Sequence, residues 1–307
     1  MIPVGRIASL LPSATEIVCA LGLEDRLVGV SHSCDHPSPI CSQPRLTRPR
    51  FPLDGLSSGE IDAAVRRALH EFGSVYEVDT ERLAGVAPDL LLTQGVCEVC
   101  AVPTRDAEAA ALALGSGPSV LALDAHDIGG VLATIRLVGR AGGVPERAER
   151  CVRDIERRIA STHARIEGRP VARLLALEWL EPPFVPGHWV PEMVALAGGN
   201  LLCGVAGRLS FAVRWEDLAG LDPDVLLVMP CGFDLAAARA DADRYRASLC
   251  AVAPRAIRSA RAYAVDATMH FSRPGPRVAD GVELLAALLH PGAFPGARLE
   301  GRAAVWV

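Results

Sequence analysis

The stretch that decides the fold runs from Pro145 to Arg169 and reads PERAERCVRDIERRIASTHARIEGR. Pro145 suits the first position of a helix, and the sequence Gly168-Arg169-Pro170 is a stop signal. Apolar residues recur every three or four positions along the stretch, at Ala148, Val152, Ile155, Ile159 and Ile166. The pattern predicts one amphipathic helix that spans roughly 33 Å, which is long enough to connect two lobes of a protein.

The sequence on the two sides of this helix repeats. Residues 81–92 read ERLAGVAPDLLL and residues 216–227 read EDLAGLDPDVLL, at a constant offset of 135 positions. A fainter match at an offset of 176 positions pairs Glu16, Val18 and Gly22 with Glu192, Val194 and Gly198. Because internal repetition indicates repeated structural units, the chain is expected to form two similar lobes.

Short apolar runs alternate with helical patterns in both halves, which predicts the α/β class: two similar lobes with parallel sheets flanked by helices, joined by one long helix. The expected domains are an N-terminal lobe at residues 1–143, the connecting helix at 144–169 and a C-terminal lobe at 170–307. Ligands of parallel sheets bind beyond the carboxyl ends of the strands. The loops richest in His, Cys, Arg and aromatic residues follow strands, so we expect them to line one cleft between the lobes.

Composition limits the class of protein. The chain has 307 residues and a formal net charge of −5, which argues against nucleic acid as a partner because nucleic-acid binders normally carry a basic excess. No apolar run reaches the length of a membrane span. A strand is predicted almost directly after Met1, with no leader between. As given, the chain is expected in the cytoplasm; if a leader was removed, it belongs in the periplasm or another extracytoplasmic compartment.

Three motifs carry a resemblance to a known family. RIASLLPSATEI lies at residues 6–17, PDLLLTQ at 88–94 and SRPGPR at 272–277. Together with the repeated junctions, they resemble the helical-backbone (class III) solute-binding proteins, and within that superfamily the cobalamin-binding branch of vitamin B12 receptors. The resemblance covers nearly the whole chain. It implies a corrinoid-binding protein that acts as the substrate-binding component of an ABC transporter and holds cobalamin or a related corrinoid between its lobes.

The same resemblance implies a docking site for the membrane permease. In the family, one carboxylate on each lobe contacts arginines of the permease, and Glu81 and Glu216 stand at the matching positions. From the residues alone, an alternative is open, because glutamates at helix starts are also favoured by the helix dipole.

Candidate ligand-binding residues lie in polar or proline-rich loops. Phe184, His188 and Trp189 combine aromatic faces with an imidazole, which suits a large planar ring and a nitrogen ligand to cobalt or iron. Arg48, Arg50 and Arg273 are suited to binding carboxylates or phosphates. The alternatives are that Trp189 packs at a helix start, that His188 caps that helix, and that the arginines form surface ion pairs.

A second candidate site consists of cysteines. Cys97 and Cys100 form a C-x-x-C pair, and Cys34 with the nearby His32 lies in another loop after a strand. If these loops meet, three thiolates with an open or His-filled position suit Zn or an iron-sulfur cluster. A redox dithiol or structurally packed cysteines remain alternatives.

The cysteines define the rival to the receptor function. The alternative is a cytoplasmic metal-binding or cluster-binding enzyme, or a metal-handling protein, on the same fold with its centre on Cys34, Cys97 and Cys100. A third possibility is an interaction module that uses Glu81 and Glu216 without any ligand. The sequence leaves open whether the protein catalyses a reaction.

Overall fold

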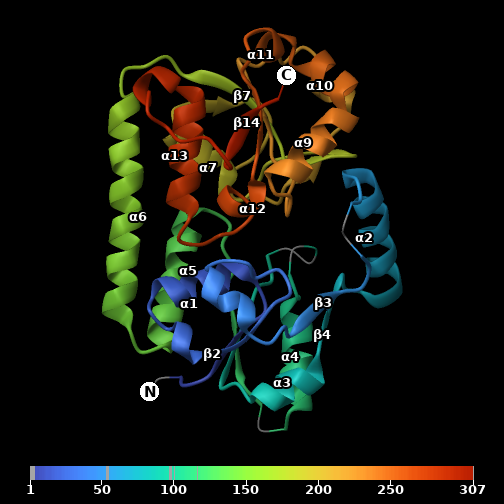
Figure 1. Ribbon diagram of the computed structural model, residues 1–307, viewed down its shortest axis with the longest axis vertical. Helices are drawn as coiled ribbons and strands as arrows, with labels where there is room; N and C mark the ends of the chain where they lie inside the picture. The colour runs from blue at the N-terminus through green and yellow to red at the C-terminus, as the bar shows by residue number, and fades with distance from the viewer. Residues whose placement is uncertain (1–3, 53–54, 97–98, 100, 116, 307) are drawn as a thin grey trace. The chain divides into compact units, whose positions relative to one another are not determined.

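The computed structural model describes residues 4–52, 55–96, 99, 101–115 and 117–306 (Figure 1). The chain divides into two compact units. The first unit comprises residues 1–54, 63–125 and 129–154, and the second comprises residues 55–62, 126–128 and 155–307. The short segments 55–62 and 126–128 belong to the second unit, although the chain on both sides of each lies in the first.

The first unit is built on a four-stranded sheet in the order β2-β1-β5-β6. Its strands are β1 (Ile7–Ser9), β2 (Leu27–Val30), β5 (Leu90–Thr93) and β6 (Ser119–Ala122), and all three pairings are parallel. All residues of β1 and β5 are buried. This burial explains their continuous apolar sequences, since central parallel strands are covered on both faces.

Helices and a small ribbon surround this sheet. Besides the start of the long helix, the α-helices that contribute residues to the first unit are α1 (Pro12–Ala20), α2 (Ser58–Phe72), α3 (Thr80–Val86), α4 (Thr104–Ala113) and α5 (Ile128–Ala141). Two short 3-10 turns are η1 (Glu24–Arg26) and η2 (Ser38–Ser42), and β3 (Thr47–Pro49) pairs antiparallel with β4 (Tyr76–Val78). Leu10, Leu46, Leu83 and Leu91 form part of the hydrophobic core of this unit.

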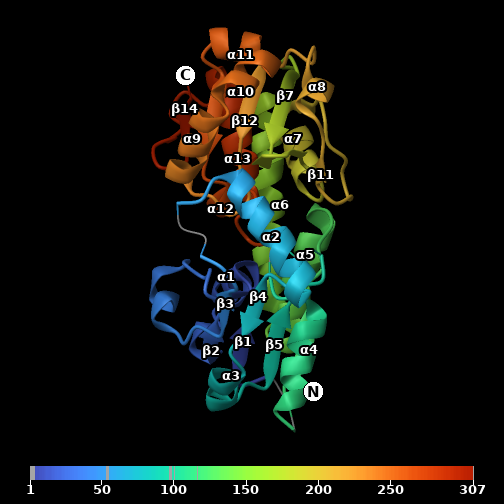
Figure 2. The same cartoon turned by 90° about the vertical axis from the view of Figure 1, so that its right-hand side faces the viewer.

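The second unit repeats this plan. Its main sheet has the order β10-β7-β12-β13-β14, with β7 (Ala172–Leu177), β10 (Gly199–Leu201), β12 (Val225–Val228), β13 (Ala262–Val265) and β14 (Ala303–Val305). Figure 2 shows β7 and β12 side by side in this unit. The first four strands pair in parallel, as in the first unit, and β14 adds an antiparallel edge.

The remaining elements of the second unit cover and extend its sheet. A three-stranded ribbon consists of β8 (Trp179–Leu180), β9 (Pro183–Val185) and β11 (Phe211–Ala212). The helices are α7 (Val190–Leu196), α8 (Trp215–Leu218), α9 (Leu235–Arg244), α10 (Arg246–Val252), α11 (Pro254–Arg258), α12 (Ala267–His270), α13 (Val278–Leu289) and the 3-10 turn η3 (Pro291–Ala293).

The register of the central strand pair is the same in both sheets. Ile7 of β1 pairs with Leu90 of β5, and Leu174 of β7 pairs with Val225 of β12. Leu90 and Val225 are 135 positions apart, the offset of the sequence repeat. The predicted fold class, with two similar α/β lobes, is therefore confirmed.

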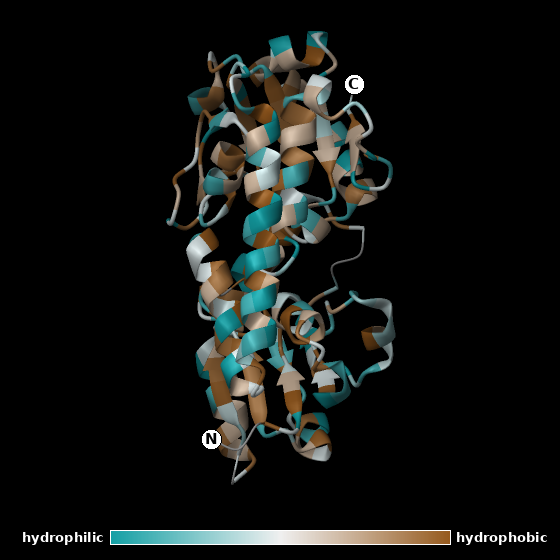
Figure 3. Cartoon of the chain, turned by 90° about the vertical axis from the view of Figure 1, so that its left-hand side faces the viewer, coloured by the Kyte–Doolittle hydropathy of each residue, from teal (hydrophilic) through white to brown (hydrophobic). Residues whose placement is uncertain are grey.

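The long helix forms as predicted. Helix α6 (Pro145–Ile166) is continuous; residues 145–154 belong to the first unit and residues 155–166 to the second. Val152 and Ile155 are buried, whereas the face of α6 turned toward the viewer in Figure 3 is largely hydrophilic. Gly168 follows the helix with φ of +73°, a left-handed conformation that glycine adopts without strain. Within the described part of the chain, every helix is too short or too polar to cross a bilayer.

Candidate functional site

Cys34 is a buried thiol, only 1% exposed. Its Sγ lies 3.1 Å from Thr15 Oγ1 and 3.3 Å from Ser31 Oγ, so two hydroxyls surround the sulfur. This environment favours a packed structural cysteine. Cys97 and Cys100 lie outside the described residues, and the convergence of the three thiols therefore remains a prediction.

His32 is held by Thr47. Its Nδ1 lies 2.8 Å from Thr47 Oγ1, and its backbone N–H donates to the same oxygen at 3.0 Å. Burial, reinforced by the charge of Arg45, lowers the pKa of His32 to about 4, which keeps the ring neutral. Among the residues that the structure describes, no group of three or more His, Cys, Asp or Glu side chains is placed to hold a metal ion.

His188 has an unusual conformation between β9 and α7. Its φ is +50°, and its backbone N–H donates to Arg208 O at 2.6 Å. The ring centroid lies 5.4 Å from that of Trp189 and 6.1 Å from that of His126. Burial lowers the pKa of His188, and the neighbouring His126 lowers it further. His188 Nε2 is buried and has no hydrogen-bond partner within the described residues.

His126 was not singled out from the sequence. It follows β6 by four positions, so the rule that ligands bind beyond strand ends could have pointed to it. No spacing motif links it to His188, however, because the two histidines are 62 positions apart. Only the packing of segment 126–128 in the second unit brings the two imidazoles together.

The two predicted aromatic residues, Trp189 and Phe184, make contacts within the fold of the second unit. Trp189 is 8% exposed, and its Nε1 donates to Phe271 O at 2.9 Å at the start of α7. This placement favours the packing alternative for Trp189. Phe184 is half-buried in the small ribbon, where it pairs with Trp179 and Ala212.

The three predicted arginines are divided between the two units: Arg48 and Arg50 belong to the first, and Arg273 belongs to the second. The exposed Arg48 of the first unit donates to both carboxylate oxygens of Glu77, at 3.0 and 3.1 Å, across the β3–β4 ribbon. Arg50 Nη1 lies 3.9 Å from Glu77 Oε2, and its guanidinium lies 4.9 Å from the centre of the Phe72 ring. These contacts favour the ion-pair alternative for both side chains.

Arg273 belongs to the second unit and is half-buried after α12. Burial raises the pKa of Asp266, and the positive charge of Arg273 opposes that shift, as does Arg277. Arg273 thus lies in a partly buried environment that contains an acidic side chain.

Glu81 and Glu216 occupy equivalent places. Each is exposed and lies in the first turn of its helix, α3 or α8. Other carboxylates bond the backbone at these helix starts: Asp79 accepts from Arg82 N at 2.9 Å, and Asp217 Oδ2 accepts from Arg214 N at 3.1 Å. Since neither glutamate provides the side-chain cap of its helix, both are accessible to a partner.

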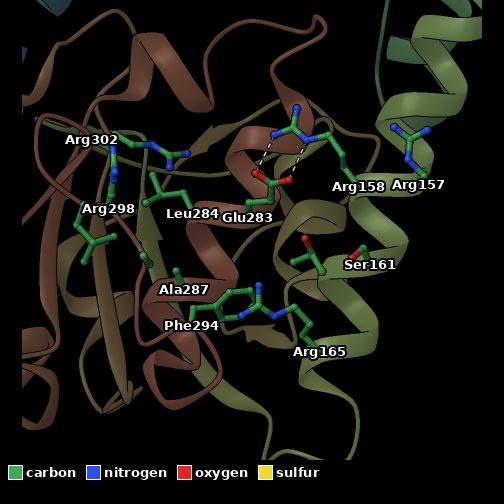
Figure 4. Close-up of a pocket in the computed structure, with 13 residues that line it drawn as sticks. Arg157, Arg158, Ser161, Arg165, Glu283, Leu284, Ala287, Phe294, Arg298 and Arg302 are labelled. Carbon is green, nitrogen blue, oxygen red and sulfur yellow. Dashed lines mark hydrogen bonds and ion pairs between the residues drawn. The ribbon is translucent and has the colours of Figure 1, made fainter.

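A groove of about 410 Å³ lies within the second unit, between α6, α13 and the C-terminal segment (Figure 4). Five arginines line it: Arg157, Arg158, Arg165, Arg298 and Arg302. Arg158 donates to both oxygens of Glu283, at 2.8 and 2.7 Å, and the Arg165 guanidinium stacks 4.2 Å above the Phe294 ring. The positive charge of the groove suits carboxylate or phosphate groups. Sequence reasoning missed it because its walls come from distant parts of the chain.

Comparison with known proteins identifies the family. Residues 7–247 match the periplasmic binding protein family. The uncharacterized ABC transporter substrate-binding lipoprotein YvrC of Bacillus subtilis is 24% identical over 297 residues, which cover 94% of this chain and 81% of that protein.

Solved structures share the fold. The periplasmic vitamin B12 binding protein BtuF of Vibrio cholerae matches with a TM-score of 0.68 and 22% identity, over 95% of this chain and 98% of that chain. A periplasmic heme binding protein from Pseudomonas aeruginosa matches with a TM-score of 0.70 and 23% identity, over 96% and 94% of the two chains. A possible iron-binding protein from Staphylococcus epidermidis matches with a TM-score of 0.69 and 18% identity, over 94% and 99%.

These relatives are named as periplasmic proteins or as a lipoprotein, so they lend no support to the cytoplasmic location expected from the sequence. They also lend no support to an iron-sulfur cluster. The family match spans more than half of the chain and agrees with the predicted resemblance. The chain therefore belongs to the periplasmic binding protein family and is a substrate-binding protein of the helical-backbone class.

Proposed function

We propose that this chain is the substrate-binding component of an ABC transporter and that its ligand is a metal-containing small molecule, with a corrinoid such as cobalamin as the favoured candidate. The observation that carries the proposal is the family match over residues 7–247 on a fold of two α/β units with the same strand order. The structures of similar fold named for vitamin B12, heme and iron support a metal-containing ligand.

Binding and release, without a covalent step, are sufficient for this function. The loops that follow the strands supply the binding residues, since such loops are the usual ligand sites of parallel sheets. Among them, His188 has the features of a metal ligand: a neutral imidazole and a nitrogen without a hydrogen-bond partner in the described part of the chain. We place His188 at the metal of the ligand.

The partner in the membrane is an ABC permease, which the name of the Bacillus subtilis relative supports. Glu81 and Glu216 are the proposed contacts, one on each unit, because they are exposed and occupy repeated positions. Carboxylates in this arrangement suit arginines of a permease. The proposed site of action is outside the cytoplasmic membrane, in keeping with relatives named as periplasmic proteins or as a lipoprotein.

The proposal is tested by titrating the purified chain with four ligands: aquacobalamin, cobinamide, haemin and a ferric siderophore. Absorption spectra and calorimetry are expected to show one equivalent of one ligand bound with a dissociation constant near or below about 1 μM. The same ligand without its metal is expected to bind more weakly. If none of the four binds, the metal-containing ligand class is wrong for this protein.

A further inference from the structure

We infer that the arginine-lined groove of the second unit is a binding site for a phosphate group that carries two negative charges, as a phosphomonoester or a pyrophosphate does. The inference is independent of the proposed function. The groove is lined by residues of α6, of α13 and of the segment 294–302, and His188, which we place at the metal of the transported ligand, is not among them. The groove is therefore a second site on the same chain.

One wall of the groove is a single face of α6. Arg158, Ser161 and Arg165 follow one another at intervals of three and four positions, a spacing that puts them on the same side of a helix. Figure 4 shows the three side chains in this order along α6. Two guanidinium groups and a hydroxyl, each able to donate hydrogen bonds, therefore line the groove in a row.

The opposite side comes from α13 and from the segment that follows η3. Leu284 and Ala287 of α13 are buried and line the groove, so they form its apolar floor. Arg298 and Arg302 extend from the segment beside them (Figure 4). Arg298 is exposed, and within the described residues it has no hydrogen-bond or ion-pair partner. Its guanidinium is thus available to an anion.

Arg158 is neutralised within the protein. It donates to both oxygens of Glu283, at 2.8 and 2.7 Å, and also to Asp280. These two carboxylates come from α13, so the contacts tie α13 to α6 and fix the width of the groove at this end. Because Arg158 takes up both carboxylates, they do not neutralise the other arginines of the groove.

Arg165 is held by neutral groups. Its Nη2 donates to Ala293 O at 2.8 Å, and its guanidinium stacks 4.2 Å above the Phe294 ring. Neither contact supplies a negative charge. The guanidinium is therefore ordered before a ligand binds and keeps its full charge, and such preorganisation raises affinity.

Arg302 is held in the same way. Its Nε donates to His270 Nε2 at 3.3 Å, and its Nη2 donates to the backbone oxygen of Asp280 at 3.2 Å. Burial, reinforced by Arg302, lowers the pKa of His270 to about 4, so the imidazole is neutral at pH 7. Arg302 consequently adds an ordered positive charge to the side of the groove opposite α6.

The excess of positive charge decides the class of ligand. Five arginines line the groove, against Glu283 and the adjoining Asp280, which leaves three positive charges in excess. A carboxylate supplies one negative charge, whereas a phosphomonoester supplies about 1.5 to 2 at pH 7 together with three acceptor oxygens. Phosphate oxygens also match the forked donors of guanidinium groups. The volume of about 410 Å³ lies within the range of small-molecule sites, roughly 300–1,000 Å³.

The test titrates the full chain with inorganic pyrophosphate by calorimetry, with citrate as a carboxylate-bearing anion for comparison. Pyrophosphate is expected to bind at one site, more weakly as salt is added, and at least about tenfold more tightly than citrate. Arg165→Gln and Arg298→Gln are each expected to weaken pyrophosphate binding by about tenfold, because each removes hydrogen bonds to a charged ligand. Arg258→Gln is the matched control, since Arg258 is an exposed arginine of the same unit that does not line the groove.

Co-sedimentation with phosphatidylcholine vesicles, with and without phosphatidic acid, distinguishes two sources of the phosphate group. Binding to the phosphatidic acid vesicles that is lost in the Arg165→Gln/Arg298→Gln double variant identifies a lipid headgroup, and pyrophosphate binding without vesicle binding identifies a soluble compound. Circular dichroism and thermal unfolding check that each variant is folded. The inference is overturned if neither probe binds, if the folded double variant binds as well as the original chain, or if citrate binds as tightly as pyrophosphate.

Discussion

Asp89 and Asp224 perform the same structural role in the two units. Asp89 Oδ2 accepts the backbone N–H of Arg6 at 2.8 Å, and Asp224 Oδ2 accepts that of Arg173 at 2.9 Å. Each arginine side chain also donates to two carbonyl oxygens of the repeated junction. The Arg6 guanidinium donates to Val86 O and Ala87 O. The Arg173 guanidinium donates to Leu221 O and Asp222 O, the equivalent positions of the second unit. The duplication therefore extends from the sequence to individual hydrogen bonds.

These carboxylates are expected to stabilise the start of the central strands. Asp89→Ala and Asp224→Ala should each lower the free energy of unfolding by about 1 kcal/mol, because a backbone N–H loses a charged acceptor. Urea denaturation measures the effect, with Glu108→Ala on the exposed face of α4 as the control. No change beyond the control in either variant would contradict the assigned role.

The repeated junctions also share a left-handed residue, Ala87 with φ of +37° and Asp222 with φ of +43°. Ala87→Gly is expected to raise the melting temperature slightly, because glycine adopts this backbone without strain. Asp222→Gly removes the same strain but also an ion pair, since Asp222 Oδ2 lies 2.5 Å from Arg255 Nη2. Thermal unfolding should therefore rank Ala87→Gly above Asp222→Gly, and the reverse order would show that the lost ion pair does not set the difference.

His270 is expected to make the second unit sensitive to acid. Burial, reinforced by Arg302, lowers its pKa from 6.5 to about 4, and Arg302 Nε donates to His270 Nε2 at 3.3 Å. The unfolded chain therefore takes up this proton first, so stability falls as pH drops from 6.5 toward 4. The loss amounts to about 3 kcal/mol.

The variant His270→Gln isolates this effect, since glutamine does not titrate. The difference in unfolding free energy between the original chain and the variant should shrink between pH 7 and pH 4. A difference that stays constant with pH would mean that His270 keeps its ordinary pKa.

Charge reversal tests the permease contacts. Glu81→Arg and Glu216→Arg, alone and together, are expected to abolish stimulation of the permease ATPase while ligand binding stays unchanged, because both side chains are exposed. Glu108→Arg is the control for a general change of surface charge. Stimulation that persists in the double variant would assign docking to other residues.

Cysteine reactivity tests the burial of Cys34. Iodoacetamide should modify the exposed Cys41 in the native protein well before Cys34, because Cys34 is 1% exposed and contacts two hydroxyls. Peptide mass spectrometry measures both sites in one sample, and both should react in urea. Rapid native labelling of Cys34 would reopen a reactive role for this thiol.

The sequence by itself determined the elements and their repetition. Apolar spacing predicted α6, because a helix with one buried face must repeat its apolar residues at the helical period. The repeat at an offset of 135 positions predicted two units of the same fold, since equal helix-to-strand junctions impose equal local geometry. Family membership followed from the same motifs.

Only the tertiary structure decided which loop side chains meet. Trp189 donates to Phe271 O across 82 positions, and His126 lies against His188 across 62 positions. Neither contact leaves a periodic signal, because local sequence reports which face of an element is buried but not which distant loop covers it. The long helix and the repeated sheets were thus specified locally, whereas the imidazole pair depends on how segment 126–128 packs beside α7 within the second unit.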